Sequence, residues 1–294
     1  MKVSVIGAGQ MGNGIAQVFA TKDHQVTMVD LNQNVLDAAH QTISGSLDRL
    51  IRKERMTEAD KQATMERLQL ETDLATGVAQ AELVVEAATE RLDLKLKIFE
   101  QLDASAPAHC ILATNTSSIS ITQIAAATKR PQQVIGMHFM NPVPIMKLVE
   151  VIRGYATSQE TTQQIMDLSR ELGKTPVEVN DYPGFVANRI LMPMINEAIT
   201  TLWEGVAGVE EIDTVMKLGM AHPMGPLQLA DFIGLDTCLA ILQVLNDGFG
   251  RPHHAPCPLL VNMVRAGKMG RKSGEGFYDY SHGGKELIVA SSFA

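Results

Sequence analysis

Short runs of β-branched and other apolar residues alternate with helical patterns through the first 180 residues of the chain. These runs lie at 3–6, 26–29, 83–85, 111–113, 134–136 and 148–151. Apolar strands separated by helices are typical of a mostly parallel sheet that is covered by helices on both faces. The pattern therefore predicts an α/β Rossmann-type domain over residues 1–181.

The segment between the second and third apolar runs is longer than a single crossover needs. Its apolar spacing predicts two helices, at 33–52 and 57–69. Thr57 and Glu58 fit an N-cap and a first-turn acid at the start of the second helix. We expect a helical hairpin inserted into the first domain at this point.

From Tyr182 onward the apolar residues recur at helical spacing, and no run resembles a strand. The expected helices lie at 184–203, 209–219, 225–247 and 258–266, with prolines between them. This pattern predicts a second, all-helical domain over residues 182–294. Its last dozen residues, which include Gly284, are expected to form a loose tail.

Composition and charge narrow the classes of function. The 294 residues include 25 Lys and Arg against 33 Asp and Glu, which gives a net charge of -8. Nucleic acids and anionic membranes bind broad basic surfaces, so neither partner is expected. The three cysteines are far apart, so we expect no disulfide, no metal site and a cytoplasmic location. Two long stretches, 3–21 and 109–128, carry no formal charge. Glycines and polar residues interrupt both of them, so no targeting or membrane-spanning segment is expected.

A GxGxxG motif, Gly7 to Gly12, follows the first predicted strand and opens a helix. Glycines there allow a tight turn and close backbone approach, and the helix N-terminus attracts a pyrophosphate. Asp30 closes the second predicted strand, where an acid binds an adenosine ribose and favours NAD over NADP. The alternative is a glycine-rich turn that binds no ligand.

His138 lies just beyond a predicted strand at 133–137, where open α/β sheets place their ligands. Asn141 and Glu150 follow it. A histidine that acts as a base needs an acid to fix its tautomer and to stabilise its charged form. Glu150 is a candidate for that acid, and the alternative is an ordinary polar residue of a strand.

Three further groups also have structural alternatives. The Asn115 to Ser118 segment follows a strand, and its hydroxyls can touch a substrate or cap a helix. Glu90 and Lys95 follow another strand, and from the sequence alone a solvated helix face is favoured for them. Basic residues gather between 49 and 55, where spacing puts Arg49 and Lys53 on one helical face; solvated surface is again the favoured interpretation.

Several motifs in order resemble the 3-hydroxyacyl-CoA dehydrogenase family, particularly its small bacterial 3-hydroxybutyryl-CoA dehydrogenases. They are the glycine motif at 7–12, TNTSS at 114–118, HFMNPVPIMKLVE at 138–150, PGFVANR at 183–189, PMGP at 223–226 and GEGFY at 274–278. The match runs nearly from end to end. It implies an NAD-dependent enzyme of fatty-acid or butanoate metabolism that interconverts 3-hydroxyacyl-CoA and 3-oxoacyl-CoA.

The resemblance also assigns roles to residues. It implies that His138 is the catalytic base, that Glu150 orients it, and that Ser117 and Asn188 bind the substrate oxygen. The implied contacts to NAD come from Gly7, Gly9, Gln10, Met11, Gly12, Asp30, Glu90, Lys95, Ser117, Asn141 and Lys272. Ser46 and Lys53 of the hairpin, together with Ser117, would bind the acyl-CoA. The helical domain is expected to form a homodimer.

Two other functions remain open at this point. The first is a dehydrogenase of the same architecture that acts on a free hydroxy acid or sugar acid. The His138 and Glu150 pair disfavours the hydroxyisobutyrate type, which resembles a lysine-based active site. The second is an NAD-binding protein without enzymatic activity, such as a sensor or a structural protein.

Overall fold

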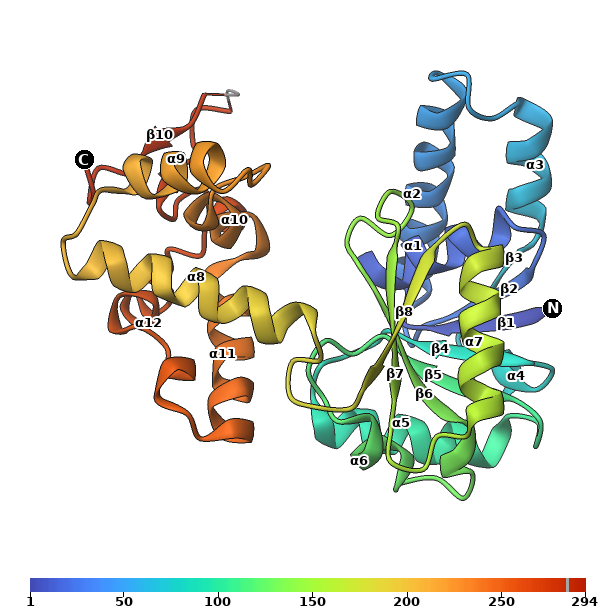
Figure 1. The fold of residues 1–294 in the computed structure, drawn as a ribbon. Coiled ribbons are helices and arrows are strands. Elements are labelled where there is room, and N and C mark those ends of the chain that lie inside the picture. The colour runs from blue at the N-terminus through green and yellow to red at the C-terminus, as the bar shows by residue number, and fades with distance from the viewer. Residues whose placement is uncertain (284–285) are drawn as a thin grey trace. The chain divides into compact units, whose positions relative to one another are not determined.

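The computed structural model describes residues 1–283 and 286–294. The chain forms two compact units, Met1–Tyr182 and Pro183–Ala294. The boundary lies one residue after the predicted one. Figure 1 shows the elements of each unit.

The first unit is built on an eight-stranded sheet with the order β3-β2-β1-β4-β5-β6-β7-β8. Its strands are β1 Lys2–Ile6, β2 Gln25–Val29, β3 Leu68–Glu71, β4 Leu83–Glu86, β5 Ile111–Thr114, β6 Val134–Phe139, β7 Leu148–Arg153 and β8 Thr175–Asn180. All neighbouring strands are parallel except β6 and β7. The predicted Rossmann-type, mostly parallel sheet is confirmed.

Helices cover both faces of this sheet (Figure 1). One face carries α1 Gln10–Ala20, α2 Gln33–Ile51 and α7 Gln159–Glu171, and the other carries α4 Leu74–Val78, α5 Leu92–Ser105 and α6 Ile121–Ala125. A short 3₁₀ turn, Pro131–Gln133, precedes β6. The central strands are buried on both faces, so their sequences are continuous apolar runs.

The predicted hairpin consists of α2 and α3, Glu58–Glu66. Thr57 caps α3 in a capping box with Asp60, and Lys61 bonds to Asp48 of α2 at 2.5 Å. Two predicted details are wrong. Residues 68 and 69 belong to β3 rather than to the helix, and α2 ends before Lys53, so Arg49 and Lys53 do not share a helical face.

The second unit is helical, as predicted. It contains α8 Ala187–Trp203, α9 Val209–Gly219, α10 Pro226–Ile233, α11 Leu235–Phe249 and α12 Pro258–Arg265, with 3₁₀ turns at Pro252–His254 and Arg271–Ser273. The single helix predicted at 225–247 is broken at Gly234 into α10 and α11. Gly234 has a φ of 102°, a conformation that glycine adopts readily and that is strained for other residues. Among the described residues no single helix is long and apolar enough to cross a bilayer, and only α10 and α11 together meet the criteria, with a 98° bend between them.

The C-terminal segment is packed rather than loose, so the predicted tail is wrong. β9 Tyr278–Asp279 pairs with β10 Ile288–Val289 in an antiparallel ribbon that the sequence pattern did not indicate. Ala290 is fully buried, and its N–H donates to the Phe277 carbonyl at 3.0 Å. Gly284, also assigned to the tail, lies outside the described residues.

Asp231 of α10 fixes the start of the C-terminal segment, around β9. Its carboxylate accepts hydrogen bonds from the Phe277 and Tyr278 N–H groups and from the Tyr280 hydroxyl. Burial raises the pKa of Asp231 to about 6, and these hydrogen bonds oppose the rise. These contacts fix residues 277–280, which include β9, against α10.

Candidate active site

The pair formed by His138 and Glu150 results from the one antiparallel pairing in the sheet. The register of β6 and β7 sets these two residues directly opposite each other. His138 Nδ1 lies 2.9 Å from Glu150 Oε2, and both residues are buried, with exposures of 6% and 2%. The structure thus places His138 inside β6 and not beyond it. A carboxylate only accepts hydrogen bonds, so Nδ1 carries a proton, and in the neutral imidazole Nε2 is then an acceptor.

Ser117 lies on the other side of the imidazole. Its hydroxyl oxygen is 3.1 Å from His138 Nε2, and it comes from the loop that follows β5. Asn115 fixes this loop to β6, because its side-chain oxygen accepts a hydrogen bond from the Phe139 N–H at 2.9 Å. The alternative role for the hydroxyls of the Asn115 to Ser118 segment was to cap a helix. The helix that follows, α6, is instead capped by Ser120, whose side chain accepts a hydrogen bond from the Gln123 N–H. Ser117 is therefore placed toward the histidine.

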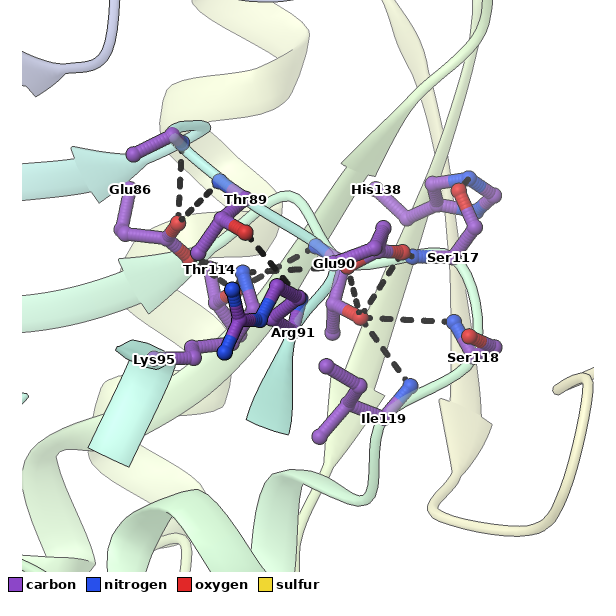
Figure 2. A network of polar contacts seen from close by, with 12 residues as sticks. Glu86, Thr89, Glu90, Arg91, Lys95, Thr114, Ser117, Ser118, Ile119 and His138 are labelled. Atoms are coloured by element: carbon purple, nitrogen blue, oxygen red, sulfur yellow. Dashed lines mark hydrogen bonds and ion pairs between the residues drawn. The ribbon is translucent and has the colours of Figure 1, made fainter. Parts of the chain in front are cut away.

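A polar network lies beside Ser117 (Figure 2). Glu90 accepts hydrogen bonds from the Ser117 N–H at 2.6 Å and from the Thr116 hydroxyl at 2.9 Å. Lys95 is only 1% exposed; its ammonium pairs with Glu86 and lies 3.8 Å from Glu90. The solvated helix face expected for Lys95 is wrong. Part of this network lines a hollow of about 260 Å³ formed by Met11, Ala87, Ala88, Thr89, Glu90, Lys95, Asn115, Thr116 and Ser117.

The glycine motif forms the turn between β1 and α1. A Cβ at Gly12 would lie 1.7 Å from the Gly7 carbonyl oxygen, and Gly7 itself has a φ of 94°. A Cβ at Gly9 would meet nothing within 4 Å. Gly9 is also the N-cap of α1 and provides no side-chain cap, so a ligand can approach the first amides of the helix.

Other predicted cofactor residues lie near this turn. Asp30 accepts a hydrogen bond from the Ala8 N–H at 2.9 Å, which fixes the acid beside the glycine motif. Gln10 donates to the Asn141 side-chain oxygen at 3.3 Å. A hollow of about 530 Å³ extends from this turn to α2, lined by Ala8, Gly9, Gln10, Asn13, Asn34, Val35, Ala38, Ala39 and Thr42. The turn, the acid and the adjoining hollow fit a dinucleotide.

The remaining predicted site residues come from other elements of the chain. Ser46 is in α2, and Lys53 is exposed in the turn after it. Asn188 lies in the first turn of α8, and Lys272 pairs with Asp236 in the second unit. Their roles remain predictions.

Known proteins match this chain along nearly its whole length. The family model of the 3-hydroxyacyl-CoA dehydrogenase NAD-binding domain matches residues 2–182, and that of the C-terminal domain of the same family matches residues 184–280. The chain belongs to the 3-hydroxyacyl-CoA dehydrogenase family. The cofactor of the family's N-terminal domain is NAD.

Individual members of the family are also similar. A probable 3-hydroxybutyryl-CoA dehydrogenase of Bacillus subtilis is 54% identical, with 95% of this chain and 97% of that protein covered. A 3-hydroxybutyryl-CoA dehydrogenase of Bradyrhizobium diazoefficiens is 52% identical, with 95% of each covered. The crystal structure of (S)-3-hydroxybutyryl-CoA dehydrogenase from Ralstonia eutropha superposes with a TM-score of 0.92 at 51% identity, with 95% of this chain and 98% of that chain covered.

The glycine motif provides a test of the cofactor site. Replacing Gly9 with Ala should leave the fold intact, since the added methyl meets no protein atom, but should weaken NADH binding on the order of tenfold by obstructing the helix N-terminus. Gly12→Ala is the contrasting variant: its methyl collides with the backbone at Gly7, so both the melting temperature and NADH binding should fall. Fluorescence titration with NADH and thermal unfolding measure the two effects. Unchanged NADH affinity in Gly9→Ala would show that the motif does not bind the dinucleotide.

Proposed function

We propose that this protein is an NAD-dependent dehydrogenase that interconverts (S)-3-hydroxyacyl-CoA and 3-oxoacyl-CoA, with 3-hydroxybutyryl-CoA as its preferred substrate. The observation that carries the proposal is the row of Ser117, His138 and Glu150, joined by contacts of 3.1 Å and 2.9 Å. A histidine held by a carboxylate on one nitrogen and facing a hydroxyl on the other is arranged to move a proton at an alcohol oxygen. The family membership and the similar 3-hydroxybutyryl-CoA dehydrogenases support the choice of substrate.

His138 is the acid and base of the proposed reaction. In the oxidative direction its Nε2 accepts the proton of the substrate 3-hydroxyl, because Nδ1 is already protonated toward Glu150. NAD, when bound, supplies the site that accepts hydride from the substrate C3. The imidazolium that results lies against the Glu150 carboxylate, which stabilises its charge in a buried site. In the reductive direction the same nitrogen returns the proton to the substrate oxygen.

Ser117 orients the substrate oxygen. Its hydroxyl already contacts His138 Nε2, so a substrate hydroxyl that reaches this nitrogen also lies within reach of Ser117. A fixed donor at this point stabilises the oxygen as it gains or loses charge. We assign Asn188 of the second unit as the other donor to this oxygen, on the family resemblance.

The hairpin is proposed to bind the nucleotide part of coenzyme A. Arg49, Arg52, Lys53 and Arg55 are all exposed. Two acids lie in the same stretch: Asp48 is paired with Lys61, and Glu54 offsets one of the four positive charges. A local basic patch of this kind attracts phosphates even though the net charge of the chain is -8. Ser46 and Lys53 are the proposed contacts.

The Lys53→Ala variant tests this assignment. We expect KM for acetoacetyl-CoA to rise roughly threefold to tenfold, since one phosphate contact is lost, while kcat stays unchanged. KM for acetoacetyl-N-acetylcysteamine, which lacks the nucleotide, should not change. Lys97→Ala removes the same charge from the exposed surface of α5 and is the matched control. Equal changes in KM for both thioesters would show that Lys53 does not bind the nucleotide part of coenzyme A.

A cytoplasmic homodimer through the helical unit is also proposed. Large apolar side chains are exposed on its α8 and α9 region, namely Ile190, Trp203, Val206, Val215, Leu218 and Met220. Exposed apolar surface of this extent is typical of an interface between protein chains.

The proposed substrate class is tested in the oxidative direction. Purified protein with NAD should form NADH when (S)-3-hydroxybutyryl-CoA is added, and should form none with the (R) enantiomer or with free 3-hydroxybutyrate. Equal rates with both enantiomers would contradict the proposed stereochemistry. NADH formation from the free acid alone would favour the hydroxy-acid dehydrogenase alternative.

A further inference from the structure

Glu86 is a buried carboxylate to which the proposed reaction gives no role. It is the last residue of β4 and has no exposed surface. Its Oε1 accepts a hydrogen bond from the Ala88 N–H at 2.9 Å, and its Oε2 accepts from the Thr114 hydroxyl at 2.8 Å and pairs with the Lys95 ammonium. A buried carboxylate persists only when donors satisfy it in this way.

The Lys95 ammonium has two acidic neighbours but pairs closely with only one of them. Glu86 is in direct contact with it, whereas the nearest oxygen of Glu90 is 3.8 Å away. Figure 2 shows Lys95 between the two acids. Because Glu86 neutralises the ammonium, the Glu90 carboxylate is directed to other donors.

Those donors belong to the loop that carries Ser117. Glu90 accepts from the Ser117 N–H at 2.6 Å and from the Thr116 hydroxyl, and Thr116 Oγ1 in turn accepts from the Ile119 N–H at 3.0 Å. The same loop brings the Ser117 hydroxyl to within 3.1 Å of His138 Nε2. The position of Glu90 therefore fixes the hydroxyl that faces the histidine.

We propose that Glu86 is a positioning residue for Ser117: by neutralising Lys95 it keeps Glu90 on the Ser117 loop. Without the negative charge at Glu86, the buried ammonium attracts Glu90 as its remaining neighbouring acid. Glu90 then moves away from the Ser117 N–H, and the Ser117 hydroxyl loses its alignment with His138. The consequence for turnover rests on the proposed function, whereas the consequence for the Ser117 loop does not.

The test is Glu86→Gln, which keeps the shape of the side chain and removes its charge. The Ser117 amide proton, measured by NMR on labelled protein, should move upfield because its short bond to a carboxylate is weakened. With NADH and acetoacetyl-CoA, kcat should fall about tenfold or more while KM for the thioester stays within about twofold. An unmoved Ser117 resonance would overturn the proposal, even if turnover fell.

Two further variants separate positioning from a loss of stability. Asp103→Asn breaks another little-exposed ion pair of the same unit, in which Asp103 contacts Arg130 at 2.8 Å. This variant should lower the melting temperature but leave both the Ser117 resonance and kcat unchanged. Equal shifts of the Ser117 resonance in Asp103→Asn and Glu86→Gln would overturn the proposal. If Glu86→Gln does not fold, the double variant Glu86→Gln/Lys95→Met takes its place, because it removes both members of the buried ion pair. No ammonium then remains to attract Glu90, so the Ser117 resonance should stay close to that of the parent, and a displaced resonance would overturn the proposal.

Measurements on the parent protein distinguish a failure of this proposal from a failure of the proposed function. Lack of turnover of acetoacetyl-CoA by the parent would reject the function, and the NMR comparison would still decide the role of Glu86.

Discussion

Replacing His138 with Gln is expected to lower kcat for acetoacetyl-CoA reduction by a factor of about 10² to 10⁴. Glutamine keeps a polar group of similar reach between Ser117 and Glu150, but it does not carry a proton to or from the substrate oxygen. The affinity for NADH should change little, since the glycine motif and Asp30 lie on other elements of the unit. Steady-state kinetics and fluorescence titration with NADH measure the two quantities.

His109→Gln is the control for that variant. His109 is exposed in the turn between α5 and β5, so its replacement should leave both kcat and NADH affinity unchanged. Near-normal turnover in His138→Gln would remove His138 from the chemistry and leave it a structural residue of β6.

Replacing Glu150 with Gln should lower kcat on the order of 10-fold to 10³-fold. The carboxylate fixes the tautomer of His138 and stabilises the positive charge that forms on the imidazole, and a neutral amide does not supply that charge. The measurement is kcat for acetoacetyl-CoA reduction by steady-state kinetics.

Glu178→Gln makes the same chemical change on the next strand. Glu178 is exposed on β8, where it pairs with Arg153 at 3.0 Å, and its loss should leave kcat unchanged. An unchanged kcat in Glu150→Gln would limit Glu150 to a structural contact with His138.

The sequence predicts the central strands of the sheet because burial on both faces requires continuous apolar runs. It misses β3 and β8, which lie at the two edges of the sheet. β8, with the sequence TPVEVN, buries only Val179, and β3, with the sequence LQLE, buries only Leu68. Edge strands of this composition lack the pattern of a buried strand, so the apolar periodicity does not separate them from loops or helix ends.

The His138 and Glu150 pair shows a similar limit at the site. Their spacing in the sequence leaves the pairing open, because the apolar runs of two neighbouring strands do not show which residues stand opposite each other. The antiparallel register of β6 and β7 sets the two residues opposite each other. The short segment between the strands, 140–147, was a usable signal, since parallel neighbours need a longer crossover.

Lys95 shows what a local pattern cannot predict. A lysine and an acid near the start of a helix are typical of solvated surface, and only the tertiary structure shows that the acid Glu86 and the Thr114 hydroxyl enclose its ammonium. The charged network beside Ser117 joins residues 86–95 to residues 114–119, two segments that are distant in sequence. The family resemblance implies that Glu90, Lys95 and Ser117 contact NAD, but only the fold shows how these residues contact one another.

The most direct measurement follows NADH absorbance after addition of acetoacetyl-CoA, and in parallel after addition of acetoacetate and a keto sugar acid. The proposed function predicts rapid NADH oxidation with the thioester and none with the two free acids. Oxidation of NADH by a free acid at a rate equal to that with the thioester, or tight NADH binding without turnover of any of the three, would contradict it.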